Sequence, residues 1–179
     1  MQSNEYQLAL SSFIKRKKQE LEDLKLIQFP EFEQISIYNH HNPEDVIDTL
    51  KKSINNTDSV LYYMTVKSDR LKIKETVKGL KKENKGAFLL PKVNESDSYI
   101  LYVGKCNSEF IKRFRCHLGI GSKRLYALHL SLWNNNPKIE IDPHYSIVHI
   151  PDKKQLHLLE VMETILHEKL KPMLGRAGH

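Results

Sequence analysis

The spacing of hydrophobic and polar positions predicts a chain in which helices and short strands alternate. Residues 60–66 are rich in β-branched and aromatic side chains, which indicates a buried strand. Asn42 followed by Pro43 is typical of a helix start, because the amide caps the first turn and proline fits its first position. The full pattern predicts helices over residues 4–27, 42–54, 74–85, 123–133 and 153–170, a short helix around Arg113, strands over 60–66 and 99–103, and two short strands within 139–150, on either side of Asp142-Pro143.

One segment combines a strand, a polar turn and a helix with reactive side chains. The strand ends near Tyr102, and either residue of Asn107-Ser108 could cap the helix that follows. Gly119 stands where a helix end often needs a positive φ. Arg113 and His117 are four residues apart and therefore project from one helix face. A tyrosine facing an arginine and a histidine is a set of side chains suited to cleaving a phosphodiester.

The last predicted helix carries an acidic residue on its apolar stripe. Leu156, Leu159, Glu163, Leu166 and Leu170 follow a spacing of three and four residues, so they share one face. A carboxylate there costs free energy unless it is paired or binds a cation. A salt bridge to a core arginine or lysine and a divalent metal ion are the two explanations that the sequence leaves open for Glu163.

The positive charge of the chain is concentrated around the tyrosine motif. The formal net charge is +6, but residues 66–93 hold nine Lys/Arg against three Asp/Glu, and residues 105–124 hold six against one. Such a concentration suits a polyanion, because each neutralised phosphate releases counterions. A solvated lysine-rich surface would give the same pattern.

The composition is that of a globular domain. The chain has 179 residues, of which 40% are hydrophobic and 28% charged. Its apolar runs are far shorter than a membrane span, so we expect no membrane partner. The polar start and the two cysteines, Cys106 and Cys116, which lack metal-site spacing, favour a cytoplasmic protein with reduced thiols.

Taken together, the ordered motifs resemble the GIY-YIG nuclease family, in the manner of a restriction-endonuclease-like or stand-alone member. The resemblance covers about residues 59–176. It rests on Leu61-Tyr62, Tyr102-Val103-Gly104, Arg113, His117 and Glu163, the last lying nine residues before Pro172.

The chain departs from the family pattern at three points. Val60 replaces the first glycine, and Gly175 stands where an asparagine is typical. The two motif tyrosines, Tyr62 and Tyr102, are separated by a long basic segment, which predicts a helical insertion between two paired strands.

The resemblance implies an α+β fold, with a small, mainly antiparallel central sheet flanked by helices. It also implies a nuclease domain over residues 59–179, with residues 1–58 as a helical N-terminal extension. The expected partner is double-stranded DNA, and a homodimer would supply two active sites for double-strand cleavage.

The implied reaction is metal-dependent hydrolysis of a phosphodiester bond by an endonuclease. Glu163 would hold Mg²⁺ or Mn²⁺, and Arg113 would bind the phosphate oxygens through its planar fork. Tyr62 is the expected general base, Tyr102 would position the water or share that role, and His117 would be a hydrogen-bond partner or proton acceptor. The residues expected to bind the DNA backbone are Lys105, Lys112, Arg115, Lys123 and Arg124.

Two other functions remain open from the sequence. The chain could be a catalytically inactive nucleic-acid-binding module of the same fold. It could also be a metalloprotein that uses some of its nine histidines, although His157 and His167 are too far apart along one helix for an ordinary zinc pair. Core packing is the simpler role for the tyrosines, most of all Tyr63. A structural hydrogen bond would be the simpler role for His117 taken alone, but the helix face that it shares with Arg113 favours a role in the site.

Overall fold

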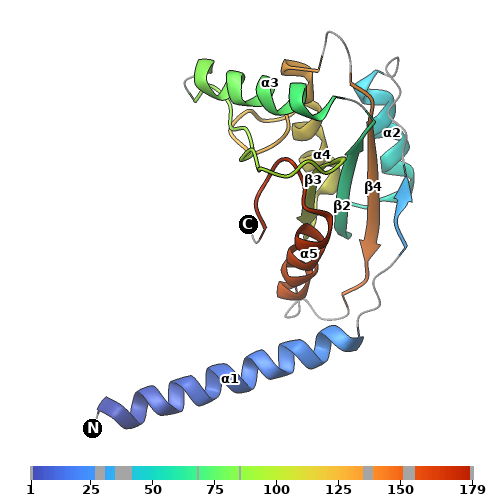
Figure 1. Ribbon diagram of the computed structural model, residues 1–179. Helices are drawn as coiled ribbons and strands as arrows, with labels where there is room; N and C mark the ends of the chain where they lie inside the picture. The colour runs from blue at the N-terminus through green and yellow to red at the C-terminus, as the bar shows by residue number, and fades with distance from the viewer. Residues whose placement is uncertain are drawn as a thin grey trace. The chain divides into compact units, whose positions relative to one another are not determined.

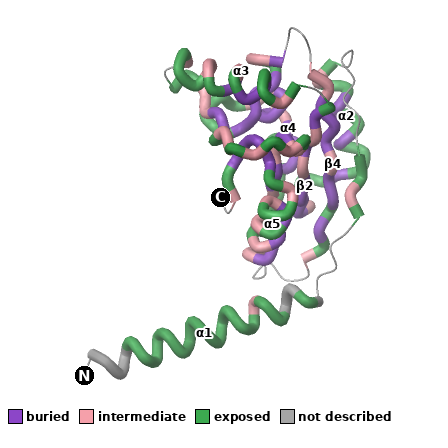
Figure 2. Tube along the Cα trace, viewed as in Figure 1, coloured by how far each residue is buried: buried purple, intermediate pink, exposed green. Residues whose placement is uncertain are grey.

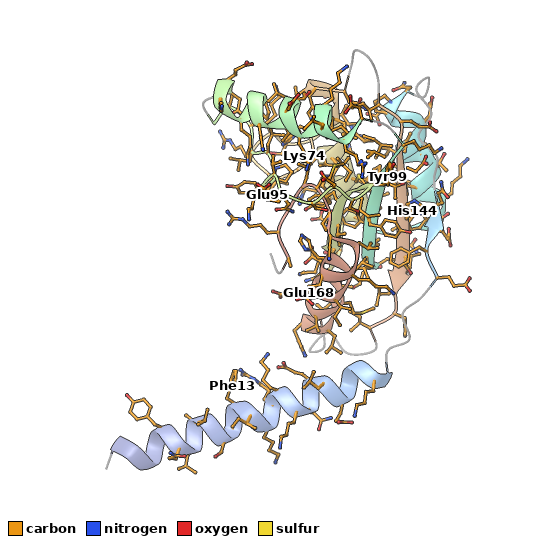
Figure 3. The ribbon with its side chains drawn as sticks, in the orientation of Figure 1. Phe13, Lys74, Glu95, Tyr99, His144 and Glu168 are labelled. Atoms are coloured by element: carbon orange, nitrogen blue, oxygen red, sulfur yellow. The ribbon has the colours of Figure 1, made fainter. Side chains whose placement is uncertain are left out.

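The computed structural model describes residues 2–26, 31–34, 42–67, 69–84, 86–134, 139–150 and 156–177. The chain divides into two compact units, Met1–Pro30 and Glu31–His179. The first unit holds α1 (Gln2–Leu26), which confirms the predicted N-terminal helix. On α1, Phe13 is half exposed, and the cationic groups of Arg16 and Lys17 lie over its ring (Figure 3).

The second unit is an α+β structure, in agreement with the predicted fold class (Figure 1). Its division from α1 falls at residues 30 and 31, so the helix after Pro43 belongs to the same unit as the predicted nuclease domain. In chain order its elements are β1 (Glu33–Gln34), α2 (Pro43–Ser53), β2 (Ser59–Val66), α3 (Arg70–Glu83), β3 (Ile100–Cys106), α4 (Phe110–Leu118), the 3₁₀ helix η1 (Leu130–Leu132), β4 (Ile141–Val148) and α5 (His157–Leu170).

Within the described residues, the sheet has four antiparallel strands in the order β1-β4-β2-β3. The strand rich in β-branched and aromatic residues, β2, is central and pairs with both β3 and β4. Because β2 and β3 are direct neighbours, the basic segment between them is an insertion that contains α3, as predicted.

A hydrophobic core packs one face of the sheet against α2 and α4. Val60, Tyr62 and Met64 alternate along β2 and pack with apolar side chains of both helices. Helix α5 packs against both β3 and β2, and its residues Leu158 and Met162 are fully buried. Buried positions are therefore concentrated along the strands and on the inner sides of these helices (Figure 2).

Asn42 confirms the predicted cap of α2. Its side-chain oxygen accepts a hydrogen bond from the Glu44 amide at 3.1 Å, with Pro43 in the first turn. Helix α3 begins four residues before its predicted start, because Asp69 caps it by accepting from the Lys72 amide at 3.1 Å.

The predicted helix over 123–133 is wrong. Its backbone groups make tertiary hydrogen bonds instead: the Lys123 carbonyl accepts from the Leu89 amide, the Ala127 amide donates to the Leu89 carbonyl, and the Leu128 amide donates to a histidine ring. Only η1, over three residues, is helical there. Apolar spacing alone cannot reveal partners so distant in sequence.

The two short strands predicted on either side of Asp142-Pro143 are one strand. β4 pairs with β2 in a continuous register, with Met64 opposite Pro143 and Thr65 opposite Asp142. A proline is compatible with a strand where its nitrogen need not donate to the neighbouring strand.

The C-terminal segment lies along the outer edge of β3. The amides of Met173 and Leu174 donate to the carbonyls of Ile100 and Leu101 at 2.8 and 2.9 Å. This contact places the residues after α5 beside the tyrosine motif. Nowhere in the described part of the chain is a helix both long enough and apolar enough to cross a membrane.

Candidate active site

The pairing of β2 with β3 brings the two motif tyrosines to the same face of the sheet. Tyr62 lies opposite Gly104, and Tyr102 lies opposite Met64, so the two side chains are diagonal neighbours. Their rings stack with centroids 6.1 Å apart. A Cβ atom at residue 104 would lie 2.6 Å from the Tyr62 hydroxyl oxygen and 2.8 Å from Cε1 of Tyr102. Glycine at this position is therefore what allows both rings to approach the strand.

The short helix α4 places His117 against both tyrosines. The Nε2 atom of His117 lies 2.8 Å from the Tyr62 hydroxyl oxygen, and both side chains are fully buried. The Leu128 amide donates to Nδ1 of the same ring at 3.2 Å. In a neutral imidazole with an accepting Nδ1, the proton is on Nε2, so His117 donates to the Tyr62 oxygen.

Arg113 lies one turn before His117 and reaches the other tyrosine. Its Nη2 atom donates to the Tyr102 hydroxyl oxygen at 3.4 Å. Arg113 and His117 thus occupy one face of α4, as predicted from their spacing. Each of the two tyrosine oxygens accepts a hydrogen bond from a side chain of this helix.

The start of α4 differs from the prediction. Neither Asn107 nor Ser108 caps the helix; its N-cap is Glu109, at φ 54° and without a side-chain cap bond. The Glu109 amide donates instead to the Asn56 carbonyl at 2.7 Å, which ties the helix start to the turn before β2. The far end agrees with the prediction, since Gly119 has a φ of 89°.

Tyr62, Tyr102, Arg113 and His117 form the tyrosine cluster, and burial is the main cause of the pKa shifts of its two tyrosines and its histidine. It raises the pKa of Tyr62 well above its usual value and lowers the pKa of His117 well below its own, because the charged form of each is poorly solvated. Burial also raises the pKa of Tyr102, and the adjacent charge of Arg113 opposes that increase. The negative charge of Glu163 raises the Tyr102 pKa further.

A cavity of about 620 Å³ opens beside this cluster at the β3 edge. Tyr102, Arg113 and Glu163 all line it, although they come from β3, α4 and α5. Glu163 is buried on the inner side of α5, as its place on the apolar stripe predicted, while Glu160 is exposed. The other lining residues are Lys81, Leu90, Pro91, Lys92, Lys105, Leu125, Tyr126, Gly175 and Arg176.

The cavity wall is strongly cationic. Five of its lining residues are lysine or arginine, and Glu163 is the one acid among them. Burial and the nearby charge of Arg176 both lower the pKa of Lys81, whose ammonium donates to the Pro91 carbonyl at 2.9 Å. Like charges held together in this way favour an anionic ligand.

Polar contacts join the two ends of the segment between β2 and β3, on either side of the part that lines the cavity. On α3, the Lys74 ammonium donates to the Ser96 carbonyl at 2.9 Å and forms an ion pair with Asp97 at 2.8 Å. Figure 3 shows Lys74 beside Glu95, whose carbonyl also accepts from it. These contacts hold the segment after α3 in place as one wall of the cavity.

Gly175, one of the three points at which the sequence departs from the resemblance, has a structural role in this chain. Its φ is +106°, and a Cβ atom there would lie 3.0 Å from Cε2 of Tyr102. The Asn94 side chain, from the insertion, donates to the carbonyls of Pro172 and Gly175, each at 3.0 Å. An amide from another part of the chain therefore fastens this segment, while glycine leaves room for the Tyr102 ring.

The predicted residues do not all lie at the cavity. Tyr62 and His117 lie behind Tyr102, and neither lines the cavity. Of the five predicted DNA-binding residues, Lys105 lines it, whereas Lys112, Arg115, Lys123 and Arg124 do not. The guanidinium of Arg115 makes a bidentate contact with Glu44 on α2, at 2.6 and 2.8 Å.

Several cavity residues were missed by sequence reasoning. Lys81 and Lys92 belong to the basic segment 66–93, but its overall charge could not show which lysines face inward. Arg176 and Tyr126 reach the cavity only through the pairing of the C-terminus with β3 and of residues 123–127 with Leu89. No local sequence signal marks such positions.

Tyr63 packs on the other side of the sheet from Tyr62. Its ring stacks on His144 with centroids 4.4 Å apart, and it meets Phe32 edge-on at 5.0 Å. These contacts agree with the packing role that the sequence predicts for Tyr63.

Within the described residues, no group of three or more His, Cys, Asp or Glu side chains is gathered as a metal site. Comparison of the chain with protein-family models, with curated proteins and with solved structures gave no match.

Proposed function

We propose that this protein is a divalent-metal-dependent DNA endonuclease of the GIY-YIG type. The observation that carries the proposal is the convergence of Tyr102, Arg113 and Glu163, from three separate elements, on one cationic cavity. Hydrolysis of a phosphodiester needs a base for water, cationic groups for the phosphate and a carboxylate for a metal ion. This cavity has a candidate for each.

Arg113 is suited to binding the scissile phosphate. Its planar guanidinium can contact two phosphate oxygens, and it lies between the tyrosine cluster and the cavity. Lys105 is close enough to line the same space and adds a second positive charge. Both would stabilise the negative charge that grows on phosphorus oxygens during attack.

Glu163 is the residue that would hold Mg²⁺ or Mn²⁺. A single buried carboxylate that faces a cavity suits a hard cation, which completes its shell with substrate oxygens and water. When bound, the cation would supply Lewis-acid chemistry at the phosphate and at the leaving oxygen.

The tyrosine pair offers the general base. Tyr62 was the expected base, but its hydroxyl is buried behind the cavity, whereas Tyr102 lines the cavity and accepts from Arg113. We therefore assign proton removal from water to Tyr102, with Tyr62 and His117 positioning its ring. The step uses Tyr102 as the phenolate, which burial opposes and the adjacent charge of Arg113 favours. The water oxygen bonds to phosphorus, the water proton goes to the phenolate oxygen of Tyr102, and the P–O bond to the leaving strand breaks, with the departing oxygen taking a proton from solvent.

The substrate is proposed to be DNA with double-stranded character. A homodimer would bring two such cavities to one duplex, and a monomer would nick its strands one after the other.

Plasmid cleavage tests the proposal. Purified protein is incubated with supercoiled DNA in the presence of Mg²⁺, Mn²⁺ or EDTA, and nicked and linear products are separated on a gel. We expect cleavage with either metal and none in EDTA. Salt-sensitive DNA binding without cleavage would instead support an inactive module of the same fold, and tightly bound zinc would support a histidine metalloprotein.

A further inference from the structure

Two large apolar side chains stand exposed at the mouth of the cationic cavity. Leu125 is 41% exposed and Tyr126 is 62% exposed, and both line the cavity. The next residues inward, Ala127 and Leu128, are fully buried. The exposed apolar side chains of this short segment are thus confined to Leu125 and Tyr126, and the Tyr126 ring lies at the cavity of the proposed active site.

The segment that carries these side chains is anchored at both ends. The Lys123 carbonyl accepts from the Leu89 amide and the Ala127 amide donates to the Leu89 carbonyl, each at 3.2 Å. The Leu128 amide then donates to the ring of His117, which itself contacts Tyr62. The position of Tyr126 is therefore fixed relative to the tyrosine cluster by a short chain of hydrogen bonds.

Positive charge surrounds this aromatic face. Lys123 and Arg124 precede it in sequence and are exposed, and Lys81, Lys92 and Arg176 line the same cavity. A cationic groove combined with an exposed aromatic ring is the arrangement that binds single-stranded nucleic acid, because lysine and arginine follow the phosphates and the ring stacks on a base.

We propose that Tyr126, supported by Leu125, stacks on an unpaired nucleobase next to the phosphate that is cleaved. This inference rests on the proposed nuclease function and narrows its substrate. In an intact duplex each base is already stacked on its neighbours, so Tyr126 has no free face to contact. The preferred substrate is therefore DNA that carries an unpaired nucleotide at the cavity, such as a duplex with a single-stranded tail.

Binding measurements without metal test this inference, because EDTA prevents cleavage. Fluorescence anisotropy compares the wild-type protein, Tyr126→Ala and Tyr126→Phe on a blunt duplex and on the same duplex with a single-stranded tail. We expect Tyr126→Ala to weaken binding of the tailed duplex by about 5- to 100-fold and binding of the blunt duplex by less than about twofold. Tyr126→Phe keeps the aromatic face and should bind as the wild type does.

Tyr99→Ala is the matched control. Tyr99 is also largely exposed, but its ring packs under Arg70 at 4.4 Å and does not line the cavity (Figure 3). We expect this variant to bind both DNAs as the wild type does. A 2-aminopurine base placed in the tail adds a direct reading, since stacking on Tyr126 should quench its fluorescence.

Equal loss on both DNAs in Tyr126→Ala, or equal loss in Tyr126→Phe and Tyr126→Ala, would overturn the stacking role. The result is separable from the plasmid test. A protein that cleaves with Mg²⁺ but binds tailed DNA independently of Tyr126 contradicts this inference alone. A protein with Tyr126-dependent binding that cleaves neither the plasmid nor the tailed duplex when Mg²⁺ is added contradicts the nuclease proposal alone.

Discussion

The imidazole of His117 donates its Nε2 proton to the hydroxyl oxygen of Tyr62 at 2.8 Å, inside the hydrophobic core of the second unit. The relationship is directional because the Leu128 amide occupies Nδ1. It joins α4, β2 and the segment after α4 through three buried polar groups. Since an unsatisfied buried group is costly, each of the three depends on the others.

The buried His117 predicts a loss of stability in acid. Burial is the main cause that lowers the pKa of His117 well below 6.5, and the charge of Arg113 lowers it further. The unfolded chain therefore binds a proton at this histidine more readily than the folded protein does. The free energy of unfolding should be constant above the unfolded pKa of about 6.5 and fall by up to about 1.4 kcal/mol per pH unit below it. Urea titrations from pH 7.5 to 5 measure this slope.

His117→Gln is the control for that measurement, because glutamine does not titrate. The variant should show a shallower dependence on pH than the wild type, with the remaining slope due to other histidines of lowered pKa, such as His129 and His144. An unchanged slope would show that His117 is not the group responsible.

Gly104 should be intolerant of a methyl group. The added Cβ atom of Gly104→Ala would lie 2.6 Å from the Tyr62 ring, which is enclosed and cannot move aside easily. Overpacking of this kind costs about 1–3 kcal/mol, and DNA cleavage should be lost with the displacement of Tyr62 and Tyr102. Thermal unfolding and the plasmid assay measure the two effects.

Gly79→Ala is the matched variant for that test. Gly79 is inside α3, and nothing lies within 4 Å of a Cβ atom placed there. The substitution should raise stability by up to about 1 kcal/mol, because alanine favours a helix over glycine. Equal behaviour of the two alanine variants would refute the close approach of the tyrosine rings to β3.

The two motif tyrosines should differ in the effect of losing their hydroxyl groups. If Tyr102 is the general base, Tyr102→Phe lowers kcat by about 10²- to 10⁴-fold with little change in stability. Tyr62→Phe leaves the His117 donor without its acceptor and should cost about 1–3 kcal/mol of stability, with a smaller loss of kcat. Single-turnover cleavage and urea unfolding separate the two effects. A larger loss of kcat in Tyr62→Phe would return the base role to Tyr62.

Two substitutions of Asn94 should lower the stability of the protein by different amounts. Asn94→Ala removes two donated hydrogen bonds, to Pro172 and Gly175, and should lower stability by about 1–2 kcal/mol. Asn94→Asp should be worse at neutral pH, because its carboxylate would face two carbonyl oxygens. Chemical unfolding at pH 7 gives the order. Greater stability in Asn94→Asp than in Asn94→Ala would contradict the assigned amide orientation.

Local patterns predicted most of the elements and the chemical side chains, but not how they combine. The Asn42-Pro43 start, the composition of β2 and the four-residue spacing of Arg113 and His117 are local signals, and each agrees with the structure. The helix predicted over 123–133 failed because its backbone binds Leu89 and His117, which lie far away in sequence.

The same difference between local signals and long-range contacts decides which residues of the candidate site could be predicted. Glu163 was noticeable because a carboxylate interrupts a leucine stripe, and its burial agrees with that reading. Lys81 and Lys92, which line the cavity, could not be identified from the sequence. The lysines of a basic segment cannot be told apart until the fold shows which of them face inward. The fastening role of Asn94 depends on the β3 edge and had no local signal.

The most direct test of the central claim is cleavage by Glu163→Gln measured beside DNA binding and unfolding of the same sample. Glutamine keeps the shape of the side chain but removes the charge that would hold the metal. Glu160→Gln, on the exposed side of the same helix, is the control. We predict that Glu163→Gln loses cleavage by at least about 100-fold while folding and DNA binding persist, and that Glu160→Gln remains active. Cleavage that survives in Glu163→Gln would contradict the account.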